Sequence, residues 1–161
     1  MKSFLKYWLP LLVWLGVIFL GSTSLMSAEH TSRLIVPILL WLKPGMSPKT
    51  IWIILVIMRK CAHVSEYAIL ALLLWRALRS GPTLRTKLPT LFSAVLLACA
   101  VFAASDEFHQ SFVKSRTPSV GDVLLDVVGA LFGLLICASF ARRHPKKARS
   151  TIESQFVDAR L

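Results

Sequence analysis

Residues 51–75 read IWIILVIMRKCAHVSEYAILALLLW, an apolar segment that carries Arg59, Lys60, His63 and Glu66 near its centre. A helix needs about 20 predominantly apolar residues to cross a membrane. An ionisable side chain inside such a helix is costly, so it is retained mainly where it pairs within a bundle or takes part in chemistry. This one segment therefore predicts both a membrane helix and a buried polar site.

The rest of the chain has the composition of a membrane protein. Its 161 residues are 55% hydrophobic and 17% charged, and the mean hydropathy is +0.65. These values exclude a soluble domain and a disordered tail. Three further segments have about the length of a spanning helix, namely residues 7–25, 88–105 and 123–141. The expected fold is all-α, an integral membrane bundle of four transmembrane helices.

The first outer loop contains a second kind of apolar segment. Residues 34–42 are almost wholly apolar, but about nine residues are too few to span the hydrocarbon core. We expect an extra interfacial or re-entrant segment here, lying on the outer leaflet.

Basic residues predict the orientation of the chain. The formal net charge is +11, and basic side chains gather in residues 2–6, 76–87 and 142–161, with fewer in the other two connections. This asymmetry places both termini in the cytoplasm. It predicts a membrane domain over residues 1–141 and a basic cytoplasmic tail over 142–161. Because the tail directly follows an apolar segment, it is typical of an anchor to anionic lipid, and no nucleic-acid partner is expected.

The polar residues of three separate segments converge on one depth. Counted from the cytoplasmic helix ends at about 1.5 Å per residue, His63 lies about 20 Å up, Asp106 about 27 Å and Asp126 about 24 Å. That depth is the outer third of a hydrocarbon core about 30 Å thick. We therefore expect one outward-facing polar site, built from three helices.

Helical phase supports this convergence. One stripe of the last helix carries Asp122, Asp126, Gly129 and Gly133. Glycines four residues apart let another helix approach closely, so the same seam is expected to point both aspartates into the bundle.

The third helix ends in a polar turn. Asp106, His109 and Gln110 share one side of this turn, whereas Glu107 is expected to project about 100° away. The loop that follows is expected to carry Arg116 over the mouth of the site.

These signatures resemble those of the VanZ-like family. The residues that carry the resemblance are Lys60-x-x-His63-x-x-Glu66-Tyr67, Asp106-Glu107-x-His109-Gln110, and Arg116, Ser119, Asp122 and Asp126 with Gly129. The resemblance extends to about Phe140. It implies a small multi-pass protein of the bacterial cytoplasmic (inner) membrane. The family is named for a member associated with teicoplanin resistance, so a link to glycopeptide resistance is one expectation.

A divalent metal is one candidate occupant of the site. Mixed imidazole and carboxylate ligands on facing helices are the way in which helical bundles hold metals. The candidate ligands are His63, Glu66, Asp106, His109 and Asp126. Nearby positive charges from Arg59, Lys60 and Arg116 would crowd a cation, so the identity of any metal stays open.

The preferred interpretation is acid–base chemistry on an anionic headgroup. Arg59, Lys60 and Arg116 would orient a phosphate or carboxylate, since arginine gives bidentate contacts. His63 and Glu66 would form a proton-transfer pair. The remaining candidates either complete the proton relay or hold a metal (Asp106, His109 and Asp126) or line the ligand site (Gln110 and Asp122). The partner would be a membrane lipid or a lipid-linked envelope precursor.

Two non-enzymatic interpretations stand beside this one. A binding or transport site would use the same residues without changing the ligand, and four helices would need to form a homo-oligomer to build a pathway. A structural network would hold the helices together through a near balance of charges. Four are positive (Arg59, Lys60, Lys114 and Arg116) and five are negative (Glu66, Asp106, Glu107, Asp122 and Asp126). Because apolar replacements of buried ion pairs are often as stable, the sequence favours a functional site over a purely structural one.

Overall fold

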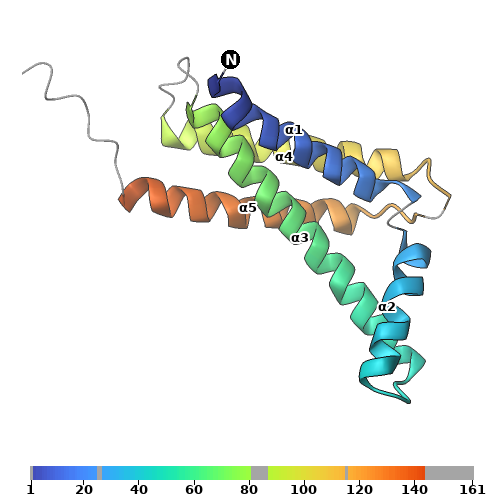
Figure 1. Ribbon diagram of the computed structural model, residues 1–161. Coiled ribbons are helices and arrows are strands. Elements are labelled where there is room, and N and C mark those ends of the chain that lie inside the picture. Colours follow the sequence, from blue (N-terminus) through green and yellow to red (C-terminus); the bar gives the residue numbers. More distant parts are fainter. Residues whose placement is uncertain (1, 25–26, 81–86, 115, 144–161) are drawn as a thin grey trace, which may run out of the picture.

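The fold is entirely helical over the part of the chain that can be described. The computed structural model describes residues 2–24, 27–80, 87–114 and 116–143. These residues form α1 (Lys2–Ser22), α2 (Ala28–Leu42), α3 (Pro48–Ser80), α4 (Leu88–Gln110) and α5 (Val120–Arg143) (Figure 1). They contain no strand, which confirms the all-α prediction. Of the predicted basic tail, only residues 142 and 143 fall within the described residues.

Three of the helices are long and apolar enough to cross a membrane. They are Phe4–Ser22, Leu88–Gln110 and Val120–Ala141, and they confirm three of the four predicted spans with somewhat different ends. The fourth predicted span lies in α3, which is not among these three helices. At 33 residues, α3 is about 50 Å long, which exceeds a hydrocarbon core of about 30 Å. A bundle of four spanning helices therefore stays a prediction.

The apolar segment of the first loop belongs to a regular helix, α2. Its 15 residues cover about 22 Å, too little to cross the core. Ser27 begins the helix, because its side chain accepts a hydrogen bond from the His30 backbone N–H. The turn after α2 contains Gly45 at φ +83°, a conformation that favours glycine. The placement of α2 at the membrane surface remains a prediction.

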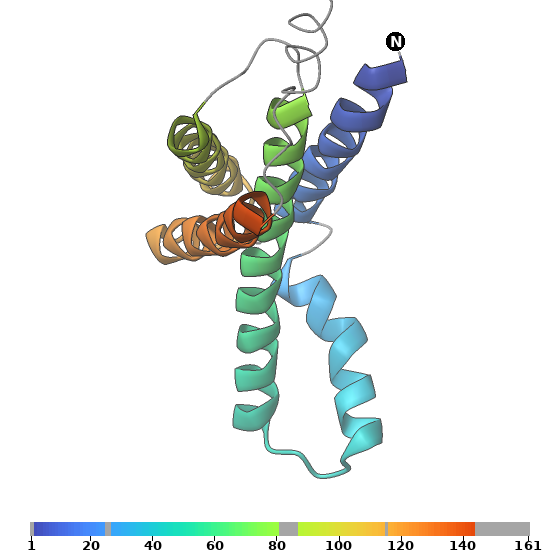
Figure 2. The ribbon, with the colours of Figure 1, turned by 90° about the vertical axis from the view of Figure 1, so that its left-hand side faces the viewer.

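The helices form a bundle with a projecting arm. The C-terminal half of α3 packs among α1, α4 and α5, whereas its N-terminal half extends away from them with α2 beside it (Figures 1 and 2). The buried side chains of the bundle half of α3 are His63, Tyr67, Leu70, Ala71, Leu74, Trp75 and Ala77. The core of the protein therefore lies around that half of α3.

Two glycines set the closest helix contact. A Cβ atom at Gly129 would overlap the backbone carbonyl of Val64, and one at Gly133 would overlap that of Ala68. No side chain therefore separates α5 from α3 at these positions. The predicted glycine seam is confirmed, and it brings the aspartates of the same stripe against α3.

Candidate functional site

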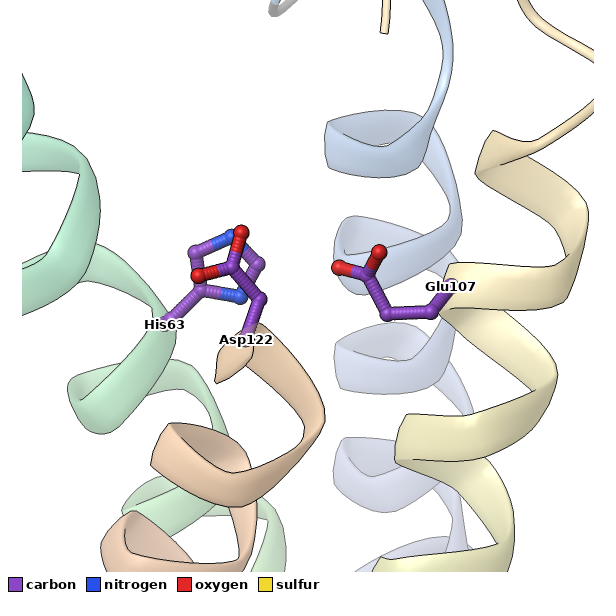
Figure 3. Close-up of side chains that lie close together, drawn as sticks. All are labelled: His63, Glu107 and Asp122. Atoms are coloured by element: carbon purple, nitrogen blue, oxygen red, sulfur yellow. The ribbon is translucent and has the colours of Figure 1, made fainter. Parts of the chain in front are cut away.

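Four buried polar side chains meet where α3 enters the bundle. His63 is 7% exposed, Glu107 6%, Asp122 2% and Asp126 0%. They come from α3, α4 and α5, and Figure 3 shows Glu107 pointing from α4 toward His63 and Asp122. Together with Arg59 and Lys60, these side chains are called the polar layer below. The convergence of three helices on one polar site agrees with the sequence-based prediction.

The polar layer contains a buried histidine–carboxylate pair. His63 Nδ1 lies 3.0 Å from Asp126 Oδ1. When the carboxylate is ionised it only accepts hydrogen bonds, so Nδ1 is then the donor, and in that neutral tautomer Nε2 keeps a free lone pair. The hydrogen-bond partner of His63 is thus Asp126 and not Glu66, with which the sequence analysis paired it. The contact lies one turn before Gly129 on the same stripe of α5.

Asp122 holds the two cations of α3. Its Oδ1 accepts a hydrogen bond from Lys60 Nζ, and its Oδ2 lies 3.5 Å from Arg59 Nη2. Asp122 sits in the first turn of α5, where the helix dipole favours a negative charge. The side chains of Arg59 and Lys60 are 37% and 36% exposed. Both cations therefore remain accessible while they are paired.

Glu107 is the principal residue whose orientation the sequence analysis missed. It was expected to point away from its neighbours, yet it is buried, and its Oε2 accepts a hydrogen bond from the Ser119 backbone N–H at 2.8 Å. The packing of α4, which the sequence alone does not fix, sets this orientation. The buried side chains of α4 follow steps of four and then three residues: Leu91, Val95, Cys99, Ala103, Glu107 and Gln110.

The other polar residues of α4 lie around this stripe. Gln110 Nε2 donates a hydrogen bond to Asp106 Oδ2 at 2.9 Å, which confirms that these two share a side of the helix. The His109 ring packs against Phe19 of α1, with ring centroids 5.0 Å apart. His109 therefore contacts α1, whereas Glu107 supplies the α4 carboxylate that meets His63.

Glu66 faces the end of α1. Its backbone carbonyl accepts a hydrogen bond from Trp14 Nε1 at 3.0 Å. A Cβ atom at Gly21 would lie 3.8 Å from Glu66 Oε1. The half-buried carboxylate is thus next to the C-terminal turn of α1.

Arg116 closes the same end of α1. Its Nη2 donates to the Gly21 carbonyl, and its Nε donates to the Thr23 carbonyl at 3.2 Å. The last carbonyls of a helix lack partners within the helix, so a cation stabilises them. Burial is the main cause that lowers the pKa of Arg116, and the charge of Arg59 acts in the same direction. Arg116, which was expected to lie over the mouth of the site, thus binds the end of α1.

Several buried oxygens of the site have no hydrogen-bond partner. Among the described residues, the unpartnered buried side-chain atoms are Ser22 Oγ, Tyr67 Oη, Glu107 Oε1 and Asp126 Oδ2. Buried polar atoms are normally satisfied, so each one requires an explanation. Two of the four are carboxylate oxygens of the polar layer, which gives that layer spare capacity to accept a proton or a cation.

The formal charges of the site are unequal. The cations Arg59, Lys60 and Arg116 face five carboxylates, namely Glu66, Asp106, Glu107, Asp122 and Asp126. Lys114, which completed the near balance in the sequence, is an exposed loop residue. With neutral histidines the site therefore has two more negative than positive charges.

The chain matches one known family. Residues 7–141 match the family model described as VanZ/LLP1, and this range includes every residue of the polar layer. No curated protein and no solved structure matches the chain.

Proposed function

The chain belongs to the VanZ/LLP1 family, and we propose that the polar layer of this membrane protein binds and chemically modifies the anionic headgroup of a membrane lipid or a lipid-linked envelope precursor. The observation that carries the proposal is the buried His63–Asp126 pair beside two partly exposed cations, Arg59 and Lys60. A polarised imidazole next to accessible positive charge is a common arrangement for acid–base chemistry on an anion.

The headgroup is held by the cations of α3. Arg59 and Lys60 are fixed in direction by Asp122, and their exposure leaves donors free to face a phosphate or carboxylate. The arginine provides a planar, bidentate donor, and the lysine provides a compact charge. Two other predicted ligand-binding residues, Arg116 and Gln110, do not contact the headgroup in this proposal. Arg116 donates its hydrogen bonds to α1, and Gln110 donates to Asp106.

The proton is transferred by His63. Asp126 orients the imidazole through Nδ1, so Nε2 is the atom that accepts or donates a proton at the headgroup. Glu66, Asp106 and His109 are the remaining predicted catalytic residues, and they are assigned to the proton path around this pair. The substrate would reach the site from the outer leaflet of a bacterial cytoplasmic membrane, with both termini of the chain in the cytoplasm.

A headgroup-binding assay tests the proposal. The parent protein would be placed in nanodiscs of phosphatidylcholine with or without phosphatidylglycerol, and thermal unfolding and lipid mass would be measured. We expect a stabilising shift with phosphatidylglycerol that His63→Gln retains and Arg59→Gln reduces. With bacterial lipid extract, a modified lipid is expected for the parent and for the matched control Lys114→Gln, but not for His63→Gln. An unchanged lipid profile in the parent would overturn the chemical step.

If the parent protein binds no headgroup, the whole proposal is overturned. Retention of a headgroup without modification would instead support the binding or transport alternative, for which a homo-oligomer is expected. We extend the proposal to glycopeptide resistance as well. Expression of the parent, but not of His63→Gln, is expected to change bacterial susceptibility to teicoplanin.

A structural network is the second candidate, and specific contacts favour it. Asp122 neutralises both cations of α3, and Arg116 binds the end of α1. If these contacts serve stability alone, exchanging the charges of one pair is expected to restore it. The double variant Lys60→Asp with Asp122→Lys would then unfold at a higher temperature than either single variant, and no lipid would change stability or mass.

A further inference from the structure

We infer that His63, Glu107 and Asp122 form a binding site for a divalent transition-metal ion, Zn²⁺ or Mn²⁺. One potential ligand atom from each of these side chains lies within 4.8 Å of the other two. The three residues come from three helices, and all are more than nine-tenths buried. The inference rests on the proposed function for the location of the site, and it names a ligand set that differs from the sequence-based one at Glu107 and Asp122.

Glu107 provides the independent sign of a ligand. One carboxylate oxygen is used by the Ser119 N–H, whereas the other, Oε1, is buried without a partner. Figure 3 shows the carboxylate directed toward His63 and Asp122. A buried carboxylate oxygen without a hydrogen-bond partner is expensive, and a metal ion at this position would satisfy it.

His63 has the geometry of a metal-binding histidine. Such histidines donate their second ring N–H to a carboxylate, which fixes the tautomer and strengthens the ligand nitrogen. The contact between Nδ1 and Asp126 Oδ1 at 3.0 Å meets this requirement and leaves Nε2 for the ion. Imidazole together with carboxylates suits Zn²⁺ and Mn²⁺ better than Ca²⁺, which prefers oxygen ligands alone.

The charge of the layer is compatible with an ion once Lys60 moves. Glu107 and Asp122 supply two negative charges, but Lys60 and Arg59 both pair with Asp122. Because their side chains are more than a third exposed, the cations have room to turn outward. Zn–N and Zn–O bonds of about 2.0–2.2 Å place ligand atoms about 3–3.5 Å apart, so a closure of about 1–2 Å is required.

An ion at this position would also change the chemistry of the proposed function. Asp122 would exchange its two cationic partners for the metal, which frees Arg59 and Lys60 for an anionic headgroup. His63 would act as a ligand, and a metal-bound water would replace it as the source of the proton transfer. Sensitivity to a chelator therefore separates this arrangement from a free imidazole base.

Metal binding to the full chain tests the site. The protein, carrying no polyhistidine tag, would be stripped of metal in phosphatidylcholine nanodiscs and titrated calorimetrically with Zn²⁺ and with Mn²⁺. We expect one ion per chain. Glu107→Gln is expected to weaken binding at least about 100-fold, the upper end of what loss of an outer partner costs. The control is Glu29→Gln, which removes an exposed carboxylate that pairs with Arg33 on α2, and it is expected to leave the metal affinity unchanged.

A second variant tests the site without removing any of the proposed metal ligands. Lys60→Gln removes a competing positive charge and is expected to tighten metal binding about tenfold, whereas a purely structural role for Lys60 predicts no gain. Circular dichroism would confirm that each variant is helical. The metal site is overturned if the parent binds neither ion, if Glu29→Gln weakens binding as much as Glu107→Gln, or if Lys60→Gln fails to tighten it.

The two proposals fail in different ways. Lipid modification that persists in a chelator and requires His63 overturns the metal site and leaves the proposed function standing. Stoichiometric metal binding that requires Glu107, in a protein that neither binds nor modifies any headgroup, supports the metal site and overturns the proposed function.

Discussion

The two halves of α3 are similarly apolar, yet they have opposite surroundings. In the bundle half, Tyr67 and Leu70 are 0% exposed, whereas in the arm half Trp52 is 65% exposed and Ile57 56%. The polar layer joins the middle of α3 to α4 and α5, and Figure 2 shows the N-terminal part of α3 extending beyond those helices. Groups at the boundary between the two halves are buried by neighbours on one side and accessible from the other. The contrast therefore explains why His63 is enclosed while Lys60, one turn earlier, is not.

The largest expected effect compares matched truncations in the two halves. Leu70→Ala removes a fully buried side chain and is expected to lower the free energy of unfolding by about 2–5 kcal/mol. Ile57→Ala removes an exposed side chain of the same size and is expected to cost less than about 0.5 kcal/mol. Unfolding in mixed detergent micelles would measure both. Equal losses would contradict the distinction between bundle and arm.

A smaller effect is expected at the glycine seam that holds the bundle half. Gly129→Ala would drive a methyl group into the Val64 carbonyl and is expected to cost about 1–3 kcal/mol through separation of the helices. Gly16→Ala is the matched control, because nothing lies within 4 Å of its added Cβ, and no loss is expected there. If both variants unfold alike, the seam does not fix the crossing of α3 and α5.

The smallest expected effect concerns the loop over the boundary. Arg116→Gln removes the charged donor from the Gly21 and Thr23 carbonyls and is expected to cost about 1–2 kcal/mol. Lys114→Gln, an exposed change in the same loop, is expected to be neutral. Thermal unfolding followed by circular dichroism would compare the two. If Arg116→Gln leaves the free energy of unfolding unchanged, Arg116 does not stabilise the end of α1, and its interpretation as an anion ligand is favoured again.

Much of the architecture was predictable, because apolar length and helical spacing are local properties. The four long apolar segments all became helices, and the stripe from Asp122 to Gly133 packs closely against another helix as predicted; that helix is α3. The helix ends were less predictable. Helix α4 continues to Gln110, beyond the predicted end at residue 105, because a polar turn that packs against other helices remains helical. The α2 segment likewise began earlier, where Ser27 caps it.

The orientation of single polar groups depended on the neighbours of each helix. The turn from Asp106 to Gln110 offers several polar side chains, and its sequence alone favoured Asp106, His109 and Gln110 as the side that faces the site. The packed stripe of α4 turns Glu107 inward instead and sets His109 against Phe19. Likewise, Arg116 was predicted as an anion ligand, yet the nearby end of α1 supplies carbonyls that bind it.

The sequence by itself determined the membrane helices, the close glycine seam and the three polar segments, because these follow from hydropathy and from a period of 3.6 residues. Only the tertiary structure decided which carboxylate meets which cation or imidazole. Rotating one helix by 100° about its axis would put Asp106 at the position of Glu107. The apolar pattern of the sequence is not sharp enough to exclude such a rotation in advance. The pairing of His63 with Asp126 and of Lys60 with Asp122 therefore results from how α3, α4 and α5 pack.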